Sequence, residues 1–140
     1  MILEDIGILL VPSNRSRMYL HHLAAHELLP SRAIVLSGDE HETPEGKVRN
    51  TRLMDIPGCP YDLNIPIEAL LSRHQIPCQK LAGLNPNADP VVDAVKQCPC
   101  SVLVYSGPGG IILRKPLLET GKRFLHVHPG IVPYFKGSTT

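Results

Sequence analysis

Two histidines near the C-terminal end of the chain have the types and spacing best suited to chemistry. His126 and His128 flank Val127, where the apolar run 123–127 (RFLHV) meets Pro129 and Gly130. Residues i and i+2 of a strand project to the same side, so we expect both imidazoles to face one site while Val127 packs inward. An imidazole titrates near neutral pH and can donate a hydrogen bond to a developing oxyanion. The pair therefore suits acyl-type transfer or metal binding.

A glycine cluster lies at the end of another apolar run. Residues 101–105 (SVLVY) are followed by 106–110 (SGPGG), and a helix pattern comes next. Glycines at such a point could let a flat ligand lie against bare backbone, although a tight strand-to-helix turn explains them equally well. The spacing is not GxGxxG, which argues against a nicotinamide or flavin site.

A third candidate segment, 12–17 (PSNRSR), opens the first predicted helix. Free backbone N–H groups and the positive end of the helix dipole favour an anion there, and Arg15 and Arg17 would strengthen that preference. The alternative is that Ser13 or Asn14 caps the helix while both arginines are solvated.

The elements that must position these segments alternate in type. Continuous apolar runs predict strands, and apolar residues at helical spacing predict helices between them. We expect strands at 6–11, 33–36, 76–81, 101–105 and 123–127, and helices at 14–29, 67–74, 90–97 and 116–120. Asn64 and Asp89 are expected caps, and 38–62 is expected to be a long loop that could hold a short strand at 47–53. The alternation predicts an α/β fold with an open, mostly parallel sheet covered by helices on both faces. In such a sheet, ligands bind at the carboxyl ends of the strands, where all three candidate segments lie.

Length and composition narrow the function classes. The chain has 140 residues, with 14 Lys and Arg against 13 Asp and Glu, a net charge of +1 and no tryptophan. We expect one domain that does not bind nucleic acid. No apolar run approaches the roughly 20 residues that cross a bilayer, and the N-terminus lacks a basic leader, so we expect no membrane partner. The four cysteines lack zinc-site spacing and are expected to be free thiols of a cytoplasmic protein.

The C-terminal part of the chain resembles the folate-dependent formyltransferase family, which includes glycinamide ribonucleotide, methionyl-tRNA and amino-sugar formyltransferases. In that family the fifth strand runs into an Asn-x-His-Pro segment, followed by Leu-Pro and a basic-Gly pair. The upstream SGPGGIIL at 106–113 is similar to the family's folate loop. The matching residues at the right spacing are His128, Pro129, Pro133, Lys136 and Gly137. The resemblance covers 101–140, and the pattern of 6–97 is compatible with the rest of the family's N-terminal domain.

This resemblance implies a Rossmann-like, formyltransferase-like catalytic domain over 1–140. It implies transfer of a formyl group from 10-formyltetrahydrofolate to a primary amine of a small, anionic acceptor such as an amino sugar nucleotide, with no metal. His128 would donate to the formyl oxygen, with His126 beside it. The expected cofactor-binding residues are Ser106, Gly107, Gly109, Gly110, Ile111, Ile112 and Leu113, and the expected acceptor-binding residues are Ser13, Asn14, Arg15, Arg17, Lys136 and Gly137. Association into a homo-oligomer stays open.

The chain departs from the family pattern in two ways. The family's asparagine is His126 here, which is bulkier, titratable and able to donate from only one nitrogen when neutral. The family's catalytic aspartate lies some tens of residues after the histidine, whereas 12 residues follow His128 in this sequence. The 140 residues thus resemble the front part of the family's domain.

Two other functions compete with this interpretation. A formyltransferase-like module could bind folate or another ligand without catalysis, which the two departures favour. An HxH at a strand end is also typical of metal-dependent amidohydrolase barrels, although there it lies early in a chain of about 250 residues. His22 and His26, four residues apart on the first predicted helix, lack a third partner and are expected at the surface.

Overall fold

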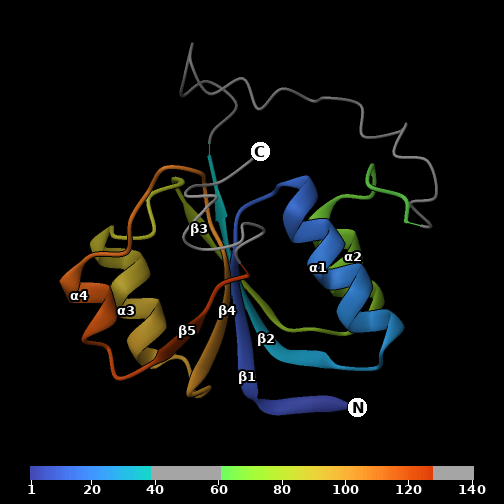
Figure 1. Cartoon of the computed structure of the whole chain (residues 1–140), viewed down its shortest axis with the longest axis horizontal. Coiled ribbons are helices and arrows are strands. Elements are labelled where there is room, and N and C mark those ends of the chain that lie inside the picture. The colour runs from blue at the N-terminus through green and yellow to red at the C-terminus, as the bar shows by residue number, and fades with distance from the viewer. Residues whose placement is uncertain (39–60, 128–140) are drawn as a thin grey trace, which may run out of the picture.

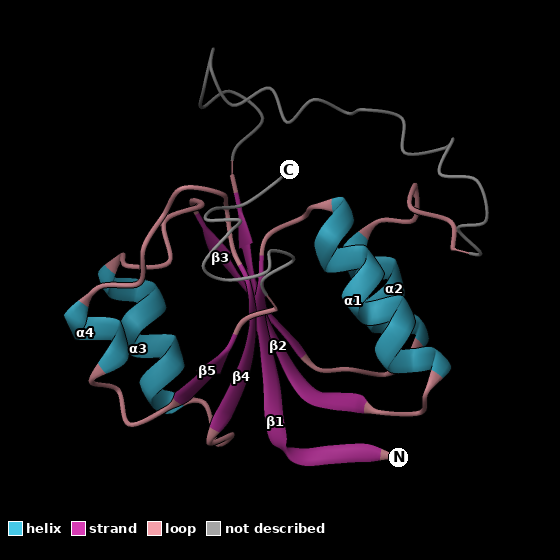
Figure 2. Ribbon diagram, in the orientation of Figure 1, coloured by secondary structure: helices cyan, strands magenta, loops and turns pink. Residues whose placement is uncertain are grey.

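Five parallel strands form one sheet with helices on both faces, which confirms the predicted α/β fold (Figures 1 and 2). The structure is a computed structural model and describes residues 1–38 and 61–127. The elements in chain order are β1 (Ile2–Leu10), α1 (Asn14–Ala25), β2 (Leu29–Ser37), α2 (Ile67–Arg73), β3 (Cys78–Ala82), α3 (Asp89–Gln97), β4 (Val102–Ser106), α4 (Lys115–Leu118) and β5 (Arg123–Leu125). The predicted strand at 47–53 lies outside the described residues, as does nearly all of the expected loop. Within the described ranges, no helix is long and apolar enough to cross a membrane.

The strand order reverses at β1. The sheet runs β3-β2-β1-β4-β5, so the chain builds outward from β1 through β2 to β3 and then crosses to the other side for β4 and β5. β1 pairs in parallel with both β2 and β4. The carboxyl ends of β1 and β4 therefore flank the switch point at which open α/β sheets bind ligands.

Alternate residues of the central strand face two separate halves of the core. Ile8 and Leu10 of β1 pack with residues of α1 and α2, whereas Leu9 packs with residues of α3 and α4. In Figure 1 the sheet is seen nearly edge on, with α1 and α2 to its right and α3 and α4 to its left. Burial on both faces explains why the middle strands have continuous apolar sequences instead of alternating ones.

The first helix ends earlier than its apolar spacing predicts. α1 stops at Ala25, Glu27 adopts a φ of 57°, and β2 begins at Leu29 with Pro30 as its second residue. The cause is β1, which starts at Ile2 and pairs Ile2 with Leu29 and Leu3 with Pro30. Proline is tolerated near the start of a strand, so the sheet takes residues that were expected to finish the helix.

Two predicted helix caps are wrong. The N-cap residues of α2 and α3 are Pro66 and Ala88, and neither side chain forms a capping hydrogen bond. Asn64 lies too early, since its backbone N–H donates to Asp62 Oδ1 at 2.9 Å in a local turn. Asp89 is the first residue of α3, where its charge still interacts favourably with the helix dipole.

The last strand is shorter than predicted. β5 ends at Leu125, and its last register pair with β4 is Val104 with Leu125. Val127 is 55% exposed, so the expectation that it packs inward is wrong. Instead its carbonyl accepts a hydrogen bond from the Tyr19 hydroxyl at 3.3 Å. His128 lies outside the described residues.

Candidate functional site

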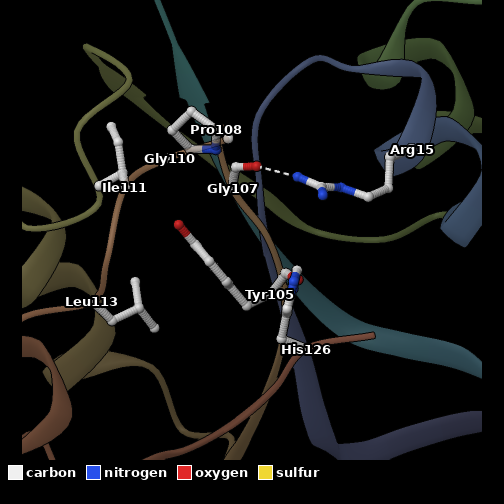
Figure 3. Close-up of a pocket in the computed structure, with 9 residues that line it drawn as sticks. Arg15, Tyr105, Gly107, Pro108, Gly110, Ile111, Leu113 and His126 are labelled. Atoms are coloured by element: carbon white, nitrogen blue, oxygen red, sulfur yellow. Dashed lines mark hydrogen bonds between the residues drawn. The ribbon is translucent and has the colours of Figure 1, made fainter. Parts of the chain in front are cut away.

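A cavity of about 230 Å³ lies at the switch point between the carboxyl ends of β1 and β4 (Figure 3). Three segments far apart in the sequence supply its walls: the first turn of α1, the loop after β4 and the residue that follows β5. The lining residues are Arg15, Tyr105, Gly107, Pro108, Gly109, Gly110, Ile111, Leu113 and His126. All of them except Tyr105 belong to the segments that the sequence analysis singled out.

The start of α1 is fixed by a group of serine hydroxyls. Ser13 is the N-cap, and its Oγ accepts a hydrogen bond from the backbone N–H of Ser16 at 3.2 Å. Ser16 and Ser106 are fully buried, and their Oγ atoms lie 2.8 Å apart. The Ser13 and Ser16 Oγ atoms lie 2.9 Å apart. This chain of hydroxyls joins α1 to β4, so these serines satisfy one another and leave the pocket wall to other residues.

Arg15 is the cation of the pocket. Its Nη2 donates to the carbonyl oxygen of Gly107 at 2.5 Å, across the switch point. Its Nε is buried and has no hydrogen-bond partner among the described residues, and no described carboxylate forms an ion pair with it. A guanidinium with free donors and an uncompensated charge favours an anionic or oxygen-rich ligand.

Tyr105 is a pocket residue that the sequence analysis missed. Its side chain is only 6% exposed, and its buried hydroxyl has no hydrogen-bond partner among the described residues. Burial raises the pKa of the phenol and Arg15 opposes this, so the hydroxyl stays protonated at neutral pH and can donate. Figure 3 shows the ring reaching from β4 toward the side of the cavity that holds Ile111 and Leu113. The only sequence signal is a hydroxyl-bearing residue at the end of an apolar run, directly before the glycine cluster.

The glycines of the loop differ in what they require. A Cβ on Gly107 would collide with the Tyr105 phenol, and Gly110 has a φ of 77°, which L side chains rarely adopt. Gly109 has neither restriction, since a Cβ there would meet nothing within 4 Å. The loop is therefore a tight strand-to-helix turn, which was one of the two expectations, and its glycine backbone also lines the cavity.

His126, an exposed residue directly after β5, lines the pocket. Its Nδ1 lies 3.1 Å from the carbonyl oxygen of Tyr105, and the two rings are tilted by 54° with centroids 5.9 Å apart. The neighbouring strand thus holds the imidazole by a backbone contact. The predicted partner, His128, is outside the described residues, as are Lys136 and Gly137.

Besides Ile112, four of the predicted site residues within the described ranges do not line the cavity. Ser13 and Ser106 belong to the hydroxyl chain, and Asn14 Oδ1 accepts from Arg17 Nη1 at 3.3 Å. Arg17 Nε donates to the carbonyl of Ile65 at 2.9 Å, which ties α1 to the segment before α2.

Ile112 also lies apart from the cavity that Ile111 and Leu113 line. Its side chain is 82% exposed, and its carbonyl accepts from Asn87 Nδ2 at 3.0 Å. Of residues 111–113, Ile111 and Leu113 line the pocket.

Among the described residues, no group of three or more His, Cys, Asp or Glu side chains is placed to hold a metal ion. His22 on α1 is exposed, as expected, and its Nδ1 lies 3.2 Å from the Tyr61 hydroxyl. The three described cysteines, Cys78, Cys98 and Cys100, are free thiols.

Comparisons with protein-family models, with curated proteins and with solved structures found no match to this chain.

Proposed function

We propose that this protein transfers a formyl group from 10-formyltetrahydrofolate to a primary amine of a small anionic acceptor. One observation carries the proposal: Arg15, the glycine loop and His126 converge on a single cavity at the switch point. Two of these segments, the loop and the end of β5, are those in which the sequence resembles folate-dependent formyltransferases.

The loop after β4 supplies the features that a flat ring system needs. Pro108, Ile111 and Leu113 give apolar walls, and the Tyr105 hydroxyl gives a buried donor with no acceptor among the residues that the structure describes. An unpartnered buried hydroxyl costs about 1–3 kcal/mol, so a ligand acceptor at this point would be favoured. The cavity is smaller than the roughly 300–1,000 Å³ of pockets for drug-sized ligands. We therefore assign the pterin ring to it, with the rest of the folate outside.

The acceptor side of the site rests on Arg15. Its charge lies at the first turn of α1, where the helix dipole also favours an anion. The phosphate of an amino sugar nucleotide is an anion of the right kind, with several oxygen acceptors for guanidinium donors. With its phosphate bound to Arg15, the acceptor would have its amine free to approach the formyl carbon.

The proposed reaction is an acyl-type transfer. The amine nitrogen bonds to the formyl carbon, the formyl oxygen takes up negative charge, and the bond from that carbon to N10 of the folate then breaks. The amine loses one proton and N10 gains one, so the products are an N-formyl amine and tetrahydrofolate. The resemblance assigns the donor to the formyl oxygen to His128.

Turnover by the whole chain tests the proposal. We would incubate the 140-residue protein with 10-formyltetrahydrofolate and a panel of amino sugar nucleotides, and follow release of tetrahydrofolate by absorbance. Release that requires both protein and amine is the expected result. Folate binding without release would replace the proposal with the non-catalytic module, and the absence of both would overturn it.

A further inference from the structure

The contact between His126 and Tyr105 fixes the protonation pattern of the imidazole. A backbone carbonyl oxygen can only accept a hydrogen bond, so the Nδ1 atom that lies 3.1 Å from it must carry the hydrogen. A neutral imidazole has one N–H. Neutral His126 therefore has an unprotonated Nε2 with a free lone pair.

The residues on both sides of this contact are held in place. Tyr105 is a residue of β4 and pairs with Leu9 in the middle of the sheet, so its carbonyl cannot shift without disturbing the core. On the other side, Leu125 pairs with Val104, and the carbonyl of Val127 accepts from the Tyr19 hydroxyl. The backbone of His126 is thus anchored before and after the residue, which favours a single ring orientation.

The other groups that face the imidazole cannot take up a proton near neutral pH. α1 contributes Arg15, which lines the cavity with His126 and is permanently charged, whereas the Tyr19 hydroxyl contacts the carbonyl of Val127. β4 contributes Tyr105, and burial raises the pKa of both tyrosines, which keeps them neutral. No Asp or Glu occurs among the described residues that line the cavity. With Nδ1 on the Tyr105 carbonyl, the lone pair of the neutral ring lies on Nε2, and no carboxylate among the described lining residues competes for the proton.

We propose that His126 is the general base of the reaction: its Nε2 accepts the proton that the amine nitrogen loses as that nitrogen bonds to the formyl carbon. This inference rests on the proposed formyl transfer. The imidazolium that forms keeps its Nδ1–H on the Tyr105 carbonyl, whose negative end stabilises the new charge. The proton then passes, directly or through solvent, to N10 as the carbon–N10 bond breaks. With its only N–H engaged, neutral His126 does not donate to the formyl oxygen.

His126→Asn is the informative variant because an amide N–H can still donate to the Tyr105 carbonyl while no titrating group remains. We expect kcat to fall by about 10²- to 10⁴-fold, the usual contribution of a general base, with little change in KM for the formyl donor. The pH dependence of the wild-type rate should differ from that of the variant, which has no titratable side chain at this position. Added imidazole should partly restore the rate of His126→Ala, which a merely structural role would not allow.

A nitrogen-15 NMR titration of histidine-labelled whole chain provides a readout that is independent of turnover. The signals that disappear in His126→Asn should show a protonated Nδ1 and an unprotonated Nε2 at high pH. A hydrogen on Nε2 at high pH, or an unchanged rate and pH profile in His126→Asn, would overturn the inference while leaving formyl transfer intact. If the wild type transfers no formyl group to any amine, the proposed function fails first and this role fails with it.

Discussion

Arg15, in the first turn of α1, donates to the Gly107 carbonyl 2.5 Å away and so bridges the two strands whose ends flank the switch point (Figure 3). The bond joins the helix that follows β1 to the loop that follows β4. One guanidinium therefore both holds the glycine loop and presents its remaining donors to the cavity.

Removing this guanidinium should weaken the acceptor site. Hydrogen bonds to charged groups contribute about 1.5–3 kcal/mol, so Arg15→Ala should raise KM for the anionic amine by roughly 10- to 150-fold. Arg15→Lys keeps the charge but loses the planar fork, and should give an intermediate value. Arg73→Ala, in an exposed position at the end of α2, is the matched control and should leave KM unchanged. Equal KM values for the Arg15 and Arg73 variants would contradict the assignment.

The packing of Tyr105 under the loop predicts different changes in the free energy of unfolding for alanine substitutions at Gly107 and Gly109. A methyl group at Gly107 meets the phenol, so Gly107→Ala should lower the free energy of unfolding by about 1–3 kcal/mol. Gly109→Ala has open space and should change it by less than about 0.5 kcal/mol. Urea denaturation of the two variants makes the comparison. In a protein that also carries Tyr105→Leu, Gly107→Ala should lower the free energy of unfolding by less. An undiminished decrease would mean that the new methyl group does not collide with the phenol.

The buried hydroxyl chain predicts coupling between α1 and β4. Ser16→Ala leaves the Ser106 hydroxyl without its partner and should cost about 1–3 kcal/mol of unfolding free energy. Because the second substitution removes the orphaned group, Ser16→Ala and Ser106→Ala together should cost less than the sum of the two. Ser72→Ala on the exposed face of α2 serves as control. Strict additivity in the double-mutant cycle would show that the two hydroxyls do not interact.

The raised pKa of Tyr105 predicts a loss of stability at alkaline pH. Above pH 10 the unfolded chain ionises this phenol while the folded chain keeps it protonated, so the folded state binds more protons and the unfolding free energy falls as pH rises. Tyr105→Phe should reduce this slope, and the part that remains includes Tyr19, whose pKa burial also raises. Denaturation curves of the wild type and of Tyr105→Phe at pH 8 and pH 11 give the change in unfolding free energy with pH for each protein. An identical slope in the variant would mean that the phenol ionises equally in both states.

The sequence predicts the fold well because burial on both faces imposes a pattern that the chain shows locally. Runs such as Ile8–Leu10 and Leu103–Tyr105 can be recognised without knowing what packs against them. The site is harder, because its contacts join segments that are distant in sequence. Arg15 and Arg17 look equivalent in the sequence, yet they are two residues apart on a helix and point about 200° from each other, so only Arg15 faces the cavity.

Side chains that act through long-range partners escape sequence analysis for the same reason. Tyr105 resembles an ordinary core residue until the loop beyond it is placed over its ring. Only then is it visible that its hydroxyl has no hydrogen-bond partner within residues 1–38 and 61–127. Ser16 resembles a polar residue on a helix surface, but it is fully buried against Ser106, 90 residues later in the chain.

The fate of the formyl carbon tests the central claim most directly. We would supply 10-formyltetrahydrofolate labelled with carbon-13 in the formyl group, together with the whole chain and the amino sugar nucleotide panel, and analyse the products by mass spectrometry and carbon NMR. Formyl transfer predicts the label as an N-formyl carbon on one amine, in amounts equal to the tetrahydrofolate released. Label found only in unreacted folate or in free formate would contradict it.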